Sequence, residues 1–528
     1  MILILLLTSG FVASMRAGKY PHVSKPGGSG PSLVLMSLSA HPDDEDGATL
    51  AYYGKLRGIN TYSLFFTRGE GGQNEIGSQL YQDLGTLRTN ETREAAKILG
   101  SEVHFAGFHD FGFSKTASET FRMWGGEDSV LARLVYYIRA LKPDVVITNH
   151  DTITTKPNRA HGNHQALGIS MYEAFGKAAD GSFHSEQFRD GITPWQVKKL
   201  FFRYRDYVAK TDSLVVIDVS LKDDQGTAIA AIGLSALRRH RSQGLAQLSE
   251  EFQKRYSLAR KYYLVRQSAP YPFDSTDLFS GIQPSPRESL RIDEPIESTP
   301  LSHPTFDISK TTAMRSKDIL AGLVKTYDST IEEVLTASGI NHELVDSVEL
   351  MNGVLEKCNV IILDLRAYEY RHDAVTYNSR ILEYVREGGN VVCLYHKEGD
   401  WNGKNLAPYP MTLTAERVTE EDAPVTMLLQ HHPLLSTPNR ISALDWNGWI
   451  QERSIYLPAD DTTKTSARYE RILSMNDTDE HQPPTSLLWC RYGKGTYTYC
   501  SLALYRQLRI GNDGAMKLFF NMISQPRR

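Results

Sequence analysis

Short apolar runs that do not alternate with polar residues separate helical stretches near the start of the chain. This order constrains the fold most. The runs lie at 33–37, 61–66, 103–105 and 144–148, and the helical stretches between them at 45–54, 87–99 and 130–140. A strand that is apolar on both faces is buried on both sides, as in a parallel sheet covered by helices. The alternation therefore predicts βαβ units and an α/β domain with a mostly parallel sheet.

The first of these runs ends in side chains that can carry chemistry. It is followed by Ala40-His41-Pro42-Asp43-Asp44, and a second polar cluster, His161-Gly162-Asn163-His164, opens a helical stretch at 165–175. Ligands of open α/β sheets bind beyond the carboxyl ends of the strands. Helices that begin there turn their positive N-terminal ends toward the same place. We therefore expect the two clusters to meet at one site.

The two clusters offer ligands for a divalent metal ion, namely His41, Asp44 and His164. Two neutral imidazoles and one carboxylate leave the ion a net positive charge and open positions, and water bound there becomes acidic. Asp43 is a candidate general base for that water. His161 is a candidate to protonate a leaving group or to stabilise an oxyanion. This arrangement predicts metal-assisted hydrolysis of an amide.

Each cluster also has a simpler interpretation. The His-Pro-Asp-Asp sequence is compatible with an ordinary helix N-terminus that has acidic residues in its first turn, and the histidine pair with surface residues. His150 also ends a strand and is a rival ligand. Two histidines and one carboxylate suit non-haem iron as well, which would make the protein an oxygenase and not a hydrolase.

The same motifs resemble those of the PIG-L/LmbE superfamily, whose members are metal-dependent N-acetylglucosamine deacetylases that usually use zinc. The resemblance covers about residues 31–265, and it is carried by the two clusters together with Thr67-Arg68-Gly69-Glu70 and Arg88-x-x-Glu91. It implies a Rossmann-like sheet and one zinc ion per chain on His41, Asp44 and His164. It also implies Asp43 as the base and His161 as the assisting residue. The alternative is a carbohydrate-binding protein with a retired site.

The resemblance further implies that Glu70, Arg88 and Asp110 bind sugar hydroxyls of an amino-sugar substrate or glycan. Arg88 and Glu91 are also compatible with a simple ion pair between helix positions i and i+3, and Asp110 with a turn residue. Arg159, where some relatives carry a tyrosine, is a further candidate to bind an anionic group or an oxyanion.

One position departs from the pattern of this superfamily. Its members often have Pro-Asp between the last two histidines, where this chain has Gly162-Asn163. A carboxylate there would raise the pKa of His161 or orient the ring, and an amide cannot supply that charge. The sequence therefore lacks the charge that would support His161 as an acid.

Changes in composition divide the chain into four parts. They are a leader at 1–30, a first domain at 31–285, a proline- and serine-rich linker at 286–312 and a second domain at 313–528. The apolar run at 2–7 and the small residues after it are typical of a signal peptide, which predicts export to the periplasm or medium. Residues 21–31 are expected to be flexible. Later in the first domain we expect strands at 199–204 and 213–219 and one long helical stretch at 227–256.

The second domain repeats the alternation without the histidines. Its strands are expected at 318–325, 359–364 and 390–395, and its helices at 330–337 and 378–386. It resembles class I glutamine amidotransferase-like domains, an α/β, flavodoxin-like architecture. That family places its nucleophilic cysteine on a Gly-x-Cys-x-Gly turn, whereas Cys393 lies inside an expected strand. We therefore expect a domain without thiol catalysis that binds substrate, covers the site or forms oligomers.

Three smaller features allow two interpretations each. Cys358, Cys393, Cys490 and Cys500 lie far from the histidine clusters and form no CxxC pair, so buried free thiols are favoured over a thiolate zinc site. The loops 401–403 and 446–449, each containing Trp-Asn-Gly, suit either sugar stacking or core packing. The run 238–244, which also occurs in exported relatives of the superfamily, suits either the path of an anionic substrate or a solvated helix face.

The overall charge argues against a nucleic-acid partner, and the hydropathy argues against a membrane-spanning helix. The net charge of −4 gives no basic footprint for a nucleic acid. No apolar run reaches the roughly 20 residues that a membrane-spanning helix needs. The oligomeric state stays open.

Overall fold

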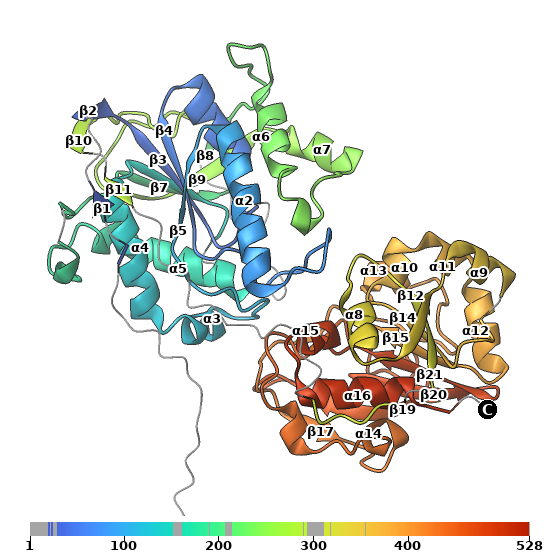
Figure 1. Cartoon of the computed structure of the whole chain (residues 1–528). Coiled ribbons are helices and arrows are strands. Elements are labelled where there is room, and N and C mark those ends of the chain that lie inside the picture. Colours follow the sequence, from blue (N-terminus) through green and yellow to red (C-terminus); the bar gives the residue numbers. More distant parts are fainter. Residues whose placement is uncertain are drawn as a thin grey trace, which may run out of the picture.

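The computed structural model describes residues 20–21, 23–24, 29–151, 161–188, 191–205, 214–288, 290–292, 311–316, 318–353 and 355–526. These residues form two α/β lobes, the first drawn from blue to green and the second from yellow to red (Figure 1). The expected signal peptide, Arg159 and most of the expected linker lie outside the described residues.

The first lobe is built on a seven-stranded sheet with the order β5-β4-β3-β6-β7-β9-β8. The strands are β3 (Val34–Ser39), β4 (Asn60–Phe65), β5 (Glu102–Phe105), β6 (Val145–Thr148), β7 (Lys199–Arg203), β8 (Leu214–Ile217) and β9 (Arg260–Gln267). The strands from β5 to β7 are parallel, and β9 and β8 are antiparallel additions. In chain order the parallel strands run 3-2-1-4-5, so the order reverses between β3 and β6. The predicted α/β domain with a mostly parallel sheet is confirmed.

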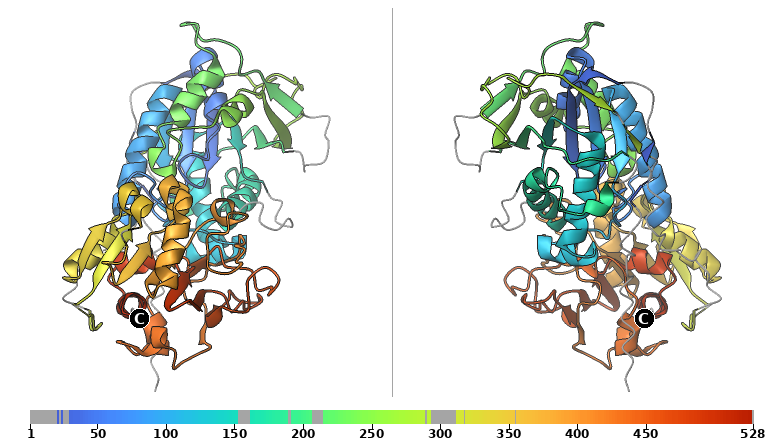
Figure 2. Two further views of the ribbon diagram at one scale, coloured as in Figure 1. Left: turned by 90° about the vertical axis from the view of Figure 1, so that its right-hand side faces the viewer. Right: turned by 90° about the vertical axis from the view of Figure 1, so that its left-hand side faces the viewer.

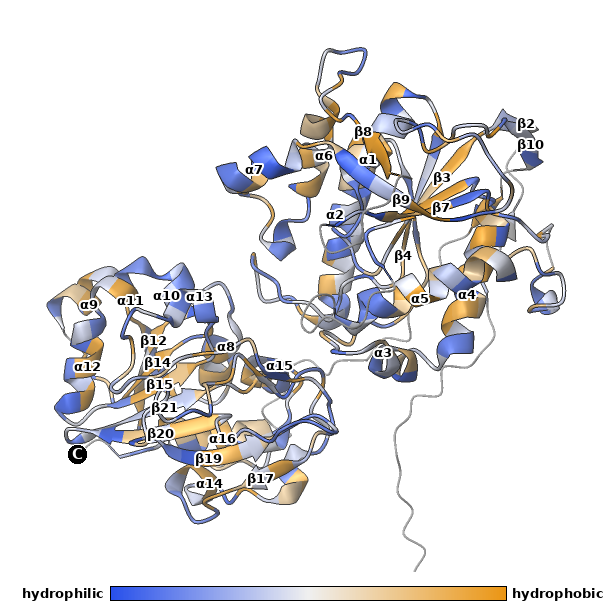
Figure 3. Ribbon diagram, turned by 180° about the vertical axis from the view of Figure 1, so that it is seen from behind, coloured by the Kyte–Doolittle hydropathy of each residue, from blue (hydrophilic) through white to orange (hydrophobic). Residues whose placement is uncertain are grey.

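Helices cover both faces of this sheet. They are α1 (Gly47–Ala51), which continues in the π-helical turn η1 (Tyr52–Leu56), α2 (Tyr81–Leu99), α3 (Ala117–Met123), α4 (Glu127–Leu141), α5 (Gly162–Lys177), α6 (Ile229–Leu237) and α7 (Glu250–Tyr256), with short turns η2 (Ser185–Gln187) and η3 (Arg241–Gln243). Neighbouring residues of β3 face opposite layers, since Leu35 packs with α1, α2 and α6 and Met36 with α4 and α5. The strands are accordingly apolar inside and the outer helix faces polar (Figure 3).

Two expectations for the first lobe differ from the structure. The long helix expected at 227–256 is wrong, because α6 and α7 are separate helices. Gly244 between them has φ +78°, a left-handed conformation that glycine adopts without strain, and Ser249 caps the start of α7. The segment expected to be a flexible lead-in contains β1 (Val23–Ser24) and β2 (Ser29–Ser32), which pair with β11 (Arg291–Ile292) and β10 (Ser285–Glu288).

The second lobe contains an eight-stranded sheet with the order β13-β12-β14-β15-β21-β20-β19-β17. Its strands are β12 (Leu320–Val324), β13 (Asn341–Leu344), β14 (Val360–Leu363), β15 (Asn390–Leu394), β17 (Val425–Met427), β19 (Glu470–Met475), β20 (Leu487–Tyr492) and β21 (Gly495–Cys500). The strands from β13 to β21 are parallel and run 2-1-3-4-5 in chain order. The remaining strands are antiparallel. The three predicted strands are confirmed, and Cys490 pairs with Tyr497 in the β20–β21 hairpin.

The other elements of the second lobe surround this sheet. They are α8 (Thr330–Ala337), α9 (Ser347–Asn352), α10 (Ala367–Tyr370), α11 (His372–Thr376), α12 (Asn378–Arg386), α13 (Glu398–Trp401), α14 (Pro433–Ser436), η5 (Ala443–Trp446), α15 (Leu504–Arg509), α16 (Asp513–Ile523) and the strand pair β16 (Arg417–Val418) and β18 (Ser454–Ile455). Trp401, Trp446 and Trp449 are buried in the cores, so the structure favours core packing over sugar stacking. All four cysteines are buried and free.

The two lobes abut each other, as the side views show (Figure 2). Leu80 and Tyr81, at the start of α2, are buried in a hydrophobic cluster made mainly of second-lobe residues. The Tyr81 hydroxyl donates a hydrogen bond of 2.9 Å to the Arg506 carbonyl. Within the described ranges, no helix is both long and apolar enough to span a bilayer.

Candidate active site

The first sheet brings the predicted residues together at the point where its strand order reverses. His41 follows β3, and His150 follows β6, the strand beside it. His161 is the N-cap of α5, and His164 lies in the first turn of that helix. The carboxyl ends of parallel strands at such a reversal form the usual ligand site of an open α/β sheet. The two clusters therefore meet there.

Two of the three atom pairs among the predicted ligands have the spacing that one metal ion requires. His41 Nδ1 and His164 Nε2 each lie 3.3 Å from the same Asp44 Oδ2 atom. Ligand atoms of a tetrahedral zinc site, with bonds of about 2.1 Å, are roughly 3.4 Å apart. His164 Nε2 is buried and, apart from this ion pair, has no partner among the described residues. The residues present thus fit a divalent metal ion.

Two other histidines lie close enough to compete as ligands. The possible ligand atoms form one group of His41, His161 and His164 and another of Asp44, His150 and His164, each within 4.8 Å. His150 Nε2 accepts a hydrogen bond of 3.1 Å from the backbone N–H of Ala40. A ring nitrogen has one lone pair, so His150 would lose this bond if that atom bound a metal. His41 Nε2 likewise faces the Asn163 amide nitrogen, so His150 stays a rival to the predicted ligands.

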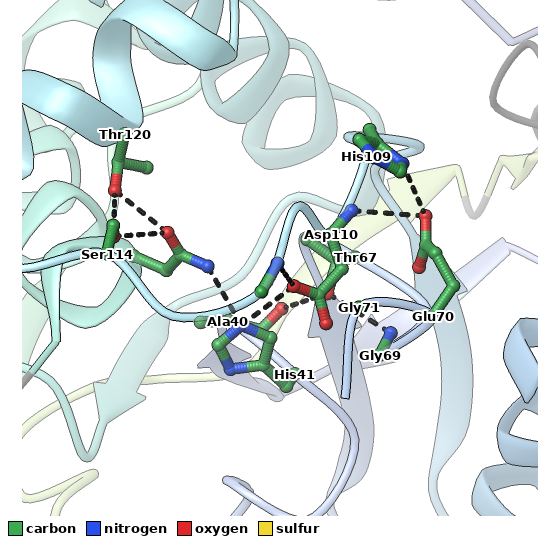
Figure 4. A network of polar contacts seen from close by, with 12 residues as sticks. Ala40, His41, Thr67, Gly69, Glu70, Gly71, His109, Asp110, Ser114 and Thr120 are labelled. Carbon is green, nitrogen blue, oxygen red and sulfur yellow. Dashed lines mark hydrogen bonds and ion pairs between the residues drawn. The ribbon is translucent and has the colours of Figure 1, made fainter. Parts of the chain in front are cut away.

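Asn163 supports His41 and not the neighbouring His161. Its side-chain oxygen accepts hydrogen bonds from the hydroxyls of Ser114, at 3.0 Å, and Thr120, at 2.8 Å. These donors fix the amide so that its nitrogen faces His41 Nε2 at 3.1 Å. Figure 4 shows Ser114, Thr120 and His41 in this network. The asparagine that departs from the superfamily pattern therefore contacts His41 and not His161.

The backbone turn that presents Asp43 is strained and held from outside. Asp43 has φ +92°, which is rare for a residue other than glycine and is concentrated at functional sites. Its N–H donates to Glu45 Oε2 at 3.0 Å, and Glu45 Oε1 lies 3.1 Å from His240 Nε2. Gln243 donates from its side chain to the Pro42 carbonyl at 2.8 Å. These contacts keep the turn in its unusual conformation.

The run 238–244 therefore has a role that neither sequence interpretation gave it. Its His240 and Gln243 clamp the Pro42–Glu45 turn, and Ser242 donates to Glu91 from its backbone N–H at 3.0 Å and from its hydroxyl at 2.7 Å. The polar residues between the arginines were the sequence feature that could have indicated this role. It could not be recognised, because their partners lie about 150 to 200 residues away in the sequence.

The charges around the site are matched to a cation. Burial opposes a charge on His41, but the carboxylates of Asp110 and Asp44 outweigh it and raise the pKa of His41 to about 9. Burial and the neighbouring imidazoles of His164 and His41 hold the pKa of His161 well below its usual value. Burial and the nearby Asp44 raise the pKa of Asp43 to about 7. Carboxylates that favour a proton on an imidazole also favour a metal ion beside it.

The predicted substrate residues take two different positions. Asp110 Oδ1 lies 4.0 Å from His41 Nε2 and accepts the Gly112 N–H at 2.9 Å. Glu70 accepts the N–H of Asp110 at 3.1 Å, so it positions that loop (Figure 4). Arg88 donates to the carbonyls of Gly69 and Gln73, both at 2.8 Å. Asp110 thus lies beside the metal ligands, while Glu70 and Arg88 hold the surrounding loops.

Part of the chain matches a known protein family. Residues 36–175 match the PIG-L family, described as GlcNAc-PI de-N-acetylase. The matched residues include all three predicted metal ligands, Asp43 and His161.

The chain is also similar in sequence to individual curated proteins. A protein of Saccharopolyspora erythraea, named 1D-myo-inositol 2-acetamido-2-deoxy-alpha-D-glucopyranoside deacetylase 2, is 29% identical over 290 residues, which are 47% of this chain and all of that protein. A deacetylase with the same substrate name from Rhodococcus jostii is 31% identical over 185 residues, 32% of this chain and 60% of the relative. These relatives are, by name, deacetylases of an N-acetylated amino sugar.

Solved structures show weaker similarity. The N,N'-diacetylchitobiose deacetylase of Pyrococcus horikoshii has a TM-score of 0.33 and 18% identity, covering 44% of this chain and 83% of that one. A β-galactosidase from Bacillus circulans has a TM-score of 0.25 and 11% identity, covering 91% of this chain and 88% of that one. Similarity at this level carries no weight for function.

Proposed function

We propose that the protein is a zinc-dependent hydrolase that removes the acetyl group from an N-acetylated amino sugar of the N-acetylglucosamine type or from its conjugate. The observation that supports this best is the convergence of His41 Nδ1 and His164 Nε2 on one Asp44 oxygen, both at 3.3 Å, within a PIG-L segment. Curated relatives named as deacetylases of such a sugar support the same substrate class.

The chemistry divides between a bound ion and the residues around it. His41, Asp44 and His164 would hold a divalent ion, which would supply an acidified water and polarise the amide carbonyl. Asp43 is adjacent to a ligand, and its strained turn fixes its backbone. As general base, its carboxylate takes a proton from the attacking water and can later pass it to the departing amine.

His161 stands on the other side of the ligand cluster. The centroid of its ring lies 4.9 Å from that of His41 and 3.9 Å from that of His164, and its Nδ1 is buried without a partner among the described residues. An N–H of this ring donates to the carbonyl oxygen as negative charge develops there, or to the leaving nitrogen. Asp110 receives a hydroxyl of the sugar ring beside His41.

The finer predictions for the rest of the chain stay proposals. The strand order 2-1-3-4-5 supports a flavodoxin-like, amidotransferase-like second domain. Cys393 lies inside β15, and burial raises the pKa of its thiol to about 12, which supports a role without thiol catalysis. The apolar run at 2–7, which is typical of a signal peptide, supports export to the periplasm or medium.

Acetate release from a panel of N-acetylated sugars tests the proposed function. The panel contains N-acetylglucosamine, N,N'-diacetylchitobiose and an N-acetylglucosaminyl inositol, each assayed with and without a chelator. We expect release from at least one compound, loss with the chelator and recovery when zinc is added. Asp43→Asn provides the background control. Sugar binding without acetate release from any compound would instead support a binding protein, and oxygen consumption would support an iron oxygenase.

A further inference from the structure

The loop 112–117 of the first domain contacts both the start of α5 and the second domain. The Ser114 carbonyl accepts a hydrogen bond of 2.7 Å from the backbone N–H of Gly162, in the first turn of α5. The Lys115 side chain donates to the Arg417 carbonyl of the second domain, also at 2.7 Å. The loop therefore connects the helix that opens at the active site with the second domain.

The glycine at the start of α5 allows the loop to come this close. A Cβ atom built on Gly162 would overlap the carbonyl oxygen of Thr116, so this position accepts no side chain while the loop lies here. The close approach brings Phe113, which lies in the same loop, against the ring of His161.

Packing is what the structure offers to orient the His161 ring. Its Nδ1 atom is buried and has no hydrogen-bond partner among the described residues, and the amide of the adjacent Asn163 faces His41 instead. A functional imidazole is usually oriented by a hydrogen bond to its second nitrogen. Here the Phe113 ring lies 5.3 Å from the imidazole, centre to centre, which is within the range of a favourable aromatic contact.

Arg417 of the second domain lies against the same phenylalanine. Its guanidinium carbon is 4.7 Å from the centre of the Phe113 ring, close enough for a cation–π contact. Its Nη2 donates to the Tyr456 hydroxyl at 2.9 Å, and its Nη1 donates to Glu452. These partners fix the guanidinium, and the carboxylate offsets its charge. Arg417 thus contacts the loop twice, with its carbonyl at Lys115 and with its side chain at Phe113.

We propose that Arg417 is a positioning residue for His161 and that it acts through Phe113. The guanidinium holds the phenylalanine ring, and that ring holds the imidazole so that its N–H faces the carbonyl oxygen or the leaving nitrogen of the substrate. This inference rests on the proposed deacetylase function, in which His161 assists the reaction. The second domain accordingly contributes to turnover without touching the reacting atoms.

The test uses the full-length protein with one substitution on each side of the contact. Arg417→Ala removes the guanidinium but keeps the carbonyl that binds Lys115. Phe113→Leu removes the ring but keeps an apolar side chain, and Phe113→Tyr keeps the ring. Arg468→Ala is the matched control, because it removes a cation–π contact of 4.8 Å to Tyr409 within the second domain. For each protein kcat and KM are measured by acetate release from a panel compound that wild type deacetylates.

We expect Arg417→Ala and Phe113→Leu to lower kcat roughly 10-fold, the scale of one lost ring or cation–π contact, with KM within about 2-fold. Phe113→Tyr and Arg468→Ala should match wild type. His161→Ala should lose more, and Arg417→Ala should then have no further effect on kcat, because the ring that it positions is absent. A loss of stability alone would lower kcat equally with and without His161.

Crystal structures of wild type and Phe113→Leu give a readout that does not depend on activity. We expect the His161 ring to have a different orientation in the variant, and the same orientation would overturn the inference. An unchanged kcat in Arg417→Ala and Phe113→Leu, an equal fall in Arg468→Ala, or an equal fall with and without His161 would overturn it as well. A wild type that releases acetate from no compound would overturn the proposed function and this inference with it.

Discussion

The two domains have related sheets, but the places where their strand orders reverse are very different. In the first domain, His41 and His150 follow β3 and β6, and buried imidazole nitrogens of His161 and His164 lack hydrogen-bond partners in the described part of the chain. In the second domain, β12 and β14 meet at the corresponding place. Asp364 there accepts from the N–H of Thr326 and from its hydroxyl, at 3.2 and 3.1 Å.

At the reversal point of the second domain, a side chain also forms an ion pair with the first domain. Arg366, only 1% exposed, pairs with Glu369 in its own domain and with Glu75 of the first domain at 3.1 Å. Its polar groups therefore serve to join the domains. Both sheets thus form a possible ligand site where the strand order reverses. Only the side chains there decide whether that site can bind a ligand, and in the first domain polar side-chain atoms are left without partners.

The largest expected effect comes from removing a metal ligand. Asp44→Ala should lose the bound metal and reduce kcat/KM by more than the roughly 100-fold that changes to outer partners of a metal site can cost. The counterpart at the second reversal point, Asp364→Asn, should keep both metal and activity. Metal content by mass spectrometry and acetate release measure the two variants. An Asp44→Ala protein that retains stoichiometric metal would show that Asp44 is not a required ligand, so the two reversal points would not differ in this way.

A change at the general base should separate metal binding from turnover. Asp43→Asn keeps the shape of the side chain but cannot take a proton, so kcat should fall by about 10² to 10⁴ while the metal stays bound. Metal content and kcat are measured on the same preparation. If Asp43→Asn turned over substrate at the wild-type rate, Asp43 would not be the base.

A weaker effect is expected from the residue that orients His41. Asn163→Ala removes the amide that faces His41 Nε2, so the affinity for zinc should fall about 10- to 100-fold. Competition with a fluorescent chelator measures this affinity. Asn439→Ala, in the second domain, is the control. Equal zinc affinity in Asn163→Ala and wild type would show that Asn163 has no part in the metal site.

The smallest effect concerns the junction between the domains. Burial and the nearby carboxylate of Asp477 in the second domain raise the pKa of Glu119 from 4.5 to about 7, despite the N–H that Lys115 donates to it. The proton therefore stabilises the folded state fully below pH 4.5, and this contribution is lost as the pH rises through 7. Glu119→Gln should melt like wild type near pH 4.5 and about 1 to 3 °C higher at pH 8.

Calorimetry at the two pH values checks this, with the exposed Glu356→Gln as the control. The quantity compared is the difference in Tm between variant and wild type at each pH. A difference that is the same at pH 4.5 and pH 8 would mean that Glu119 does not titrate between them.

The sequence predicted the convergence of His41, Asp44 and His164 because parallel strands end at one edge, so a local motif has a predictable place. It could not predict the roles of His240 and Gln243, which depend on packing against the Pro42–Glu45 turn about 200 residues away.

The same limit applies to other long-range contacts. The pairing of β1 with β11 and of β2 with β10 uses backbone hydrogen bonds, which composition does not reveal. The helix expected at 227–256 already ends at Leu237, and the chain turns again at Gly244, which has φ +78°, before α7 begins.

The most direct test is anomalous diffraction at the zinc edge from crystals of the active, full-length protein. The account predicts one peak per chain, bonded to His41, Asp44 and His164, with no peak beside Asp364 and Arg366. A fully active enzyme whose metal is bound elsewhere, or that shows no metal at these three residues, would contradict it.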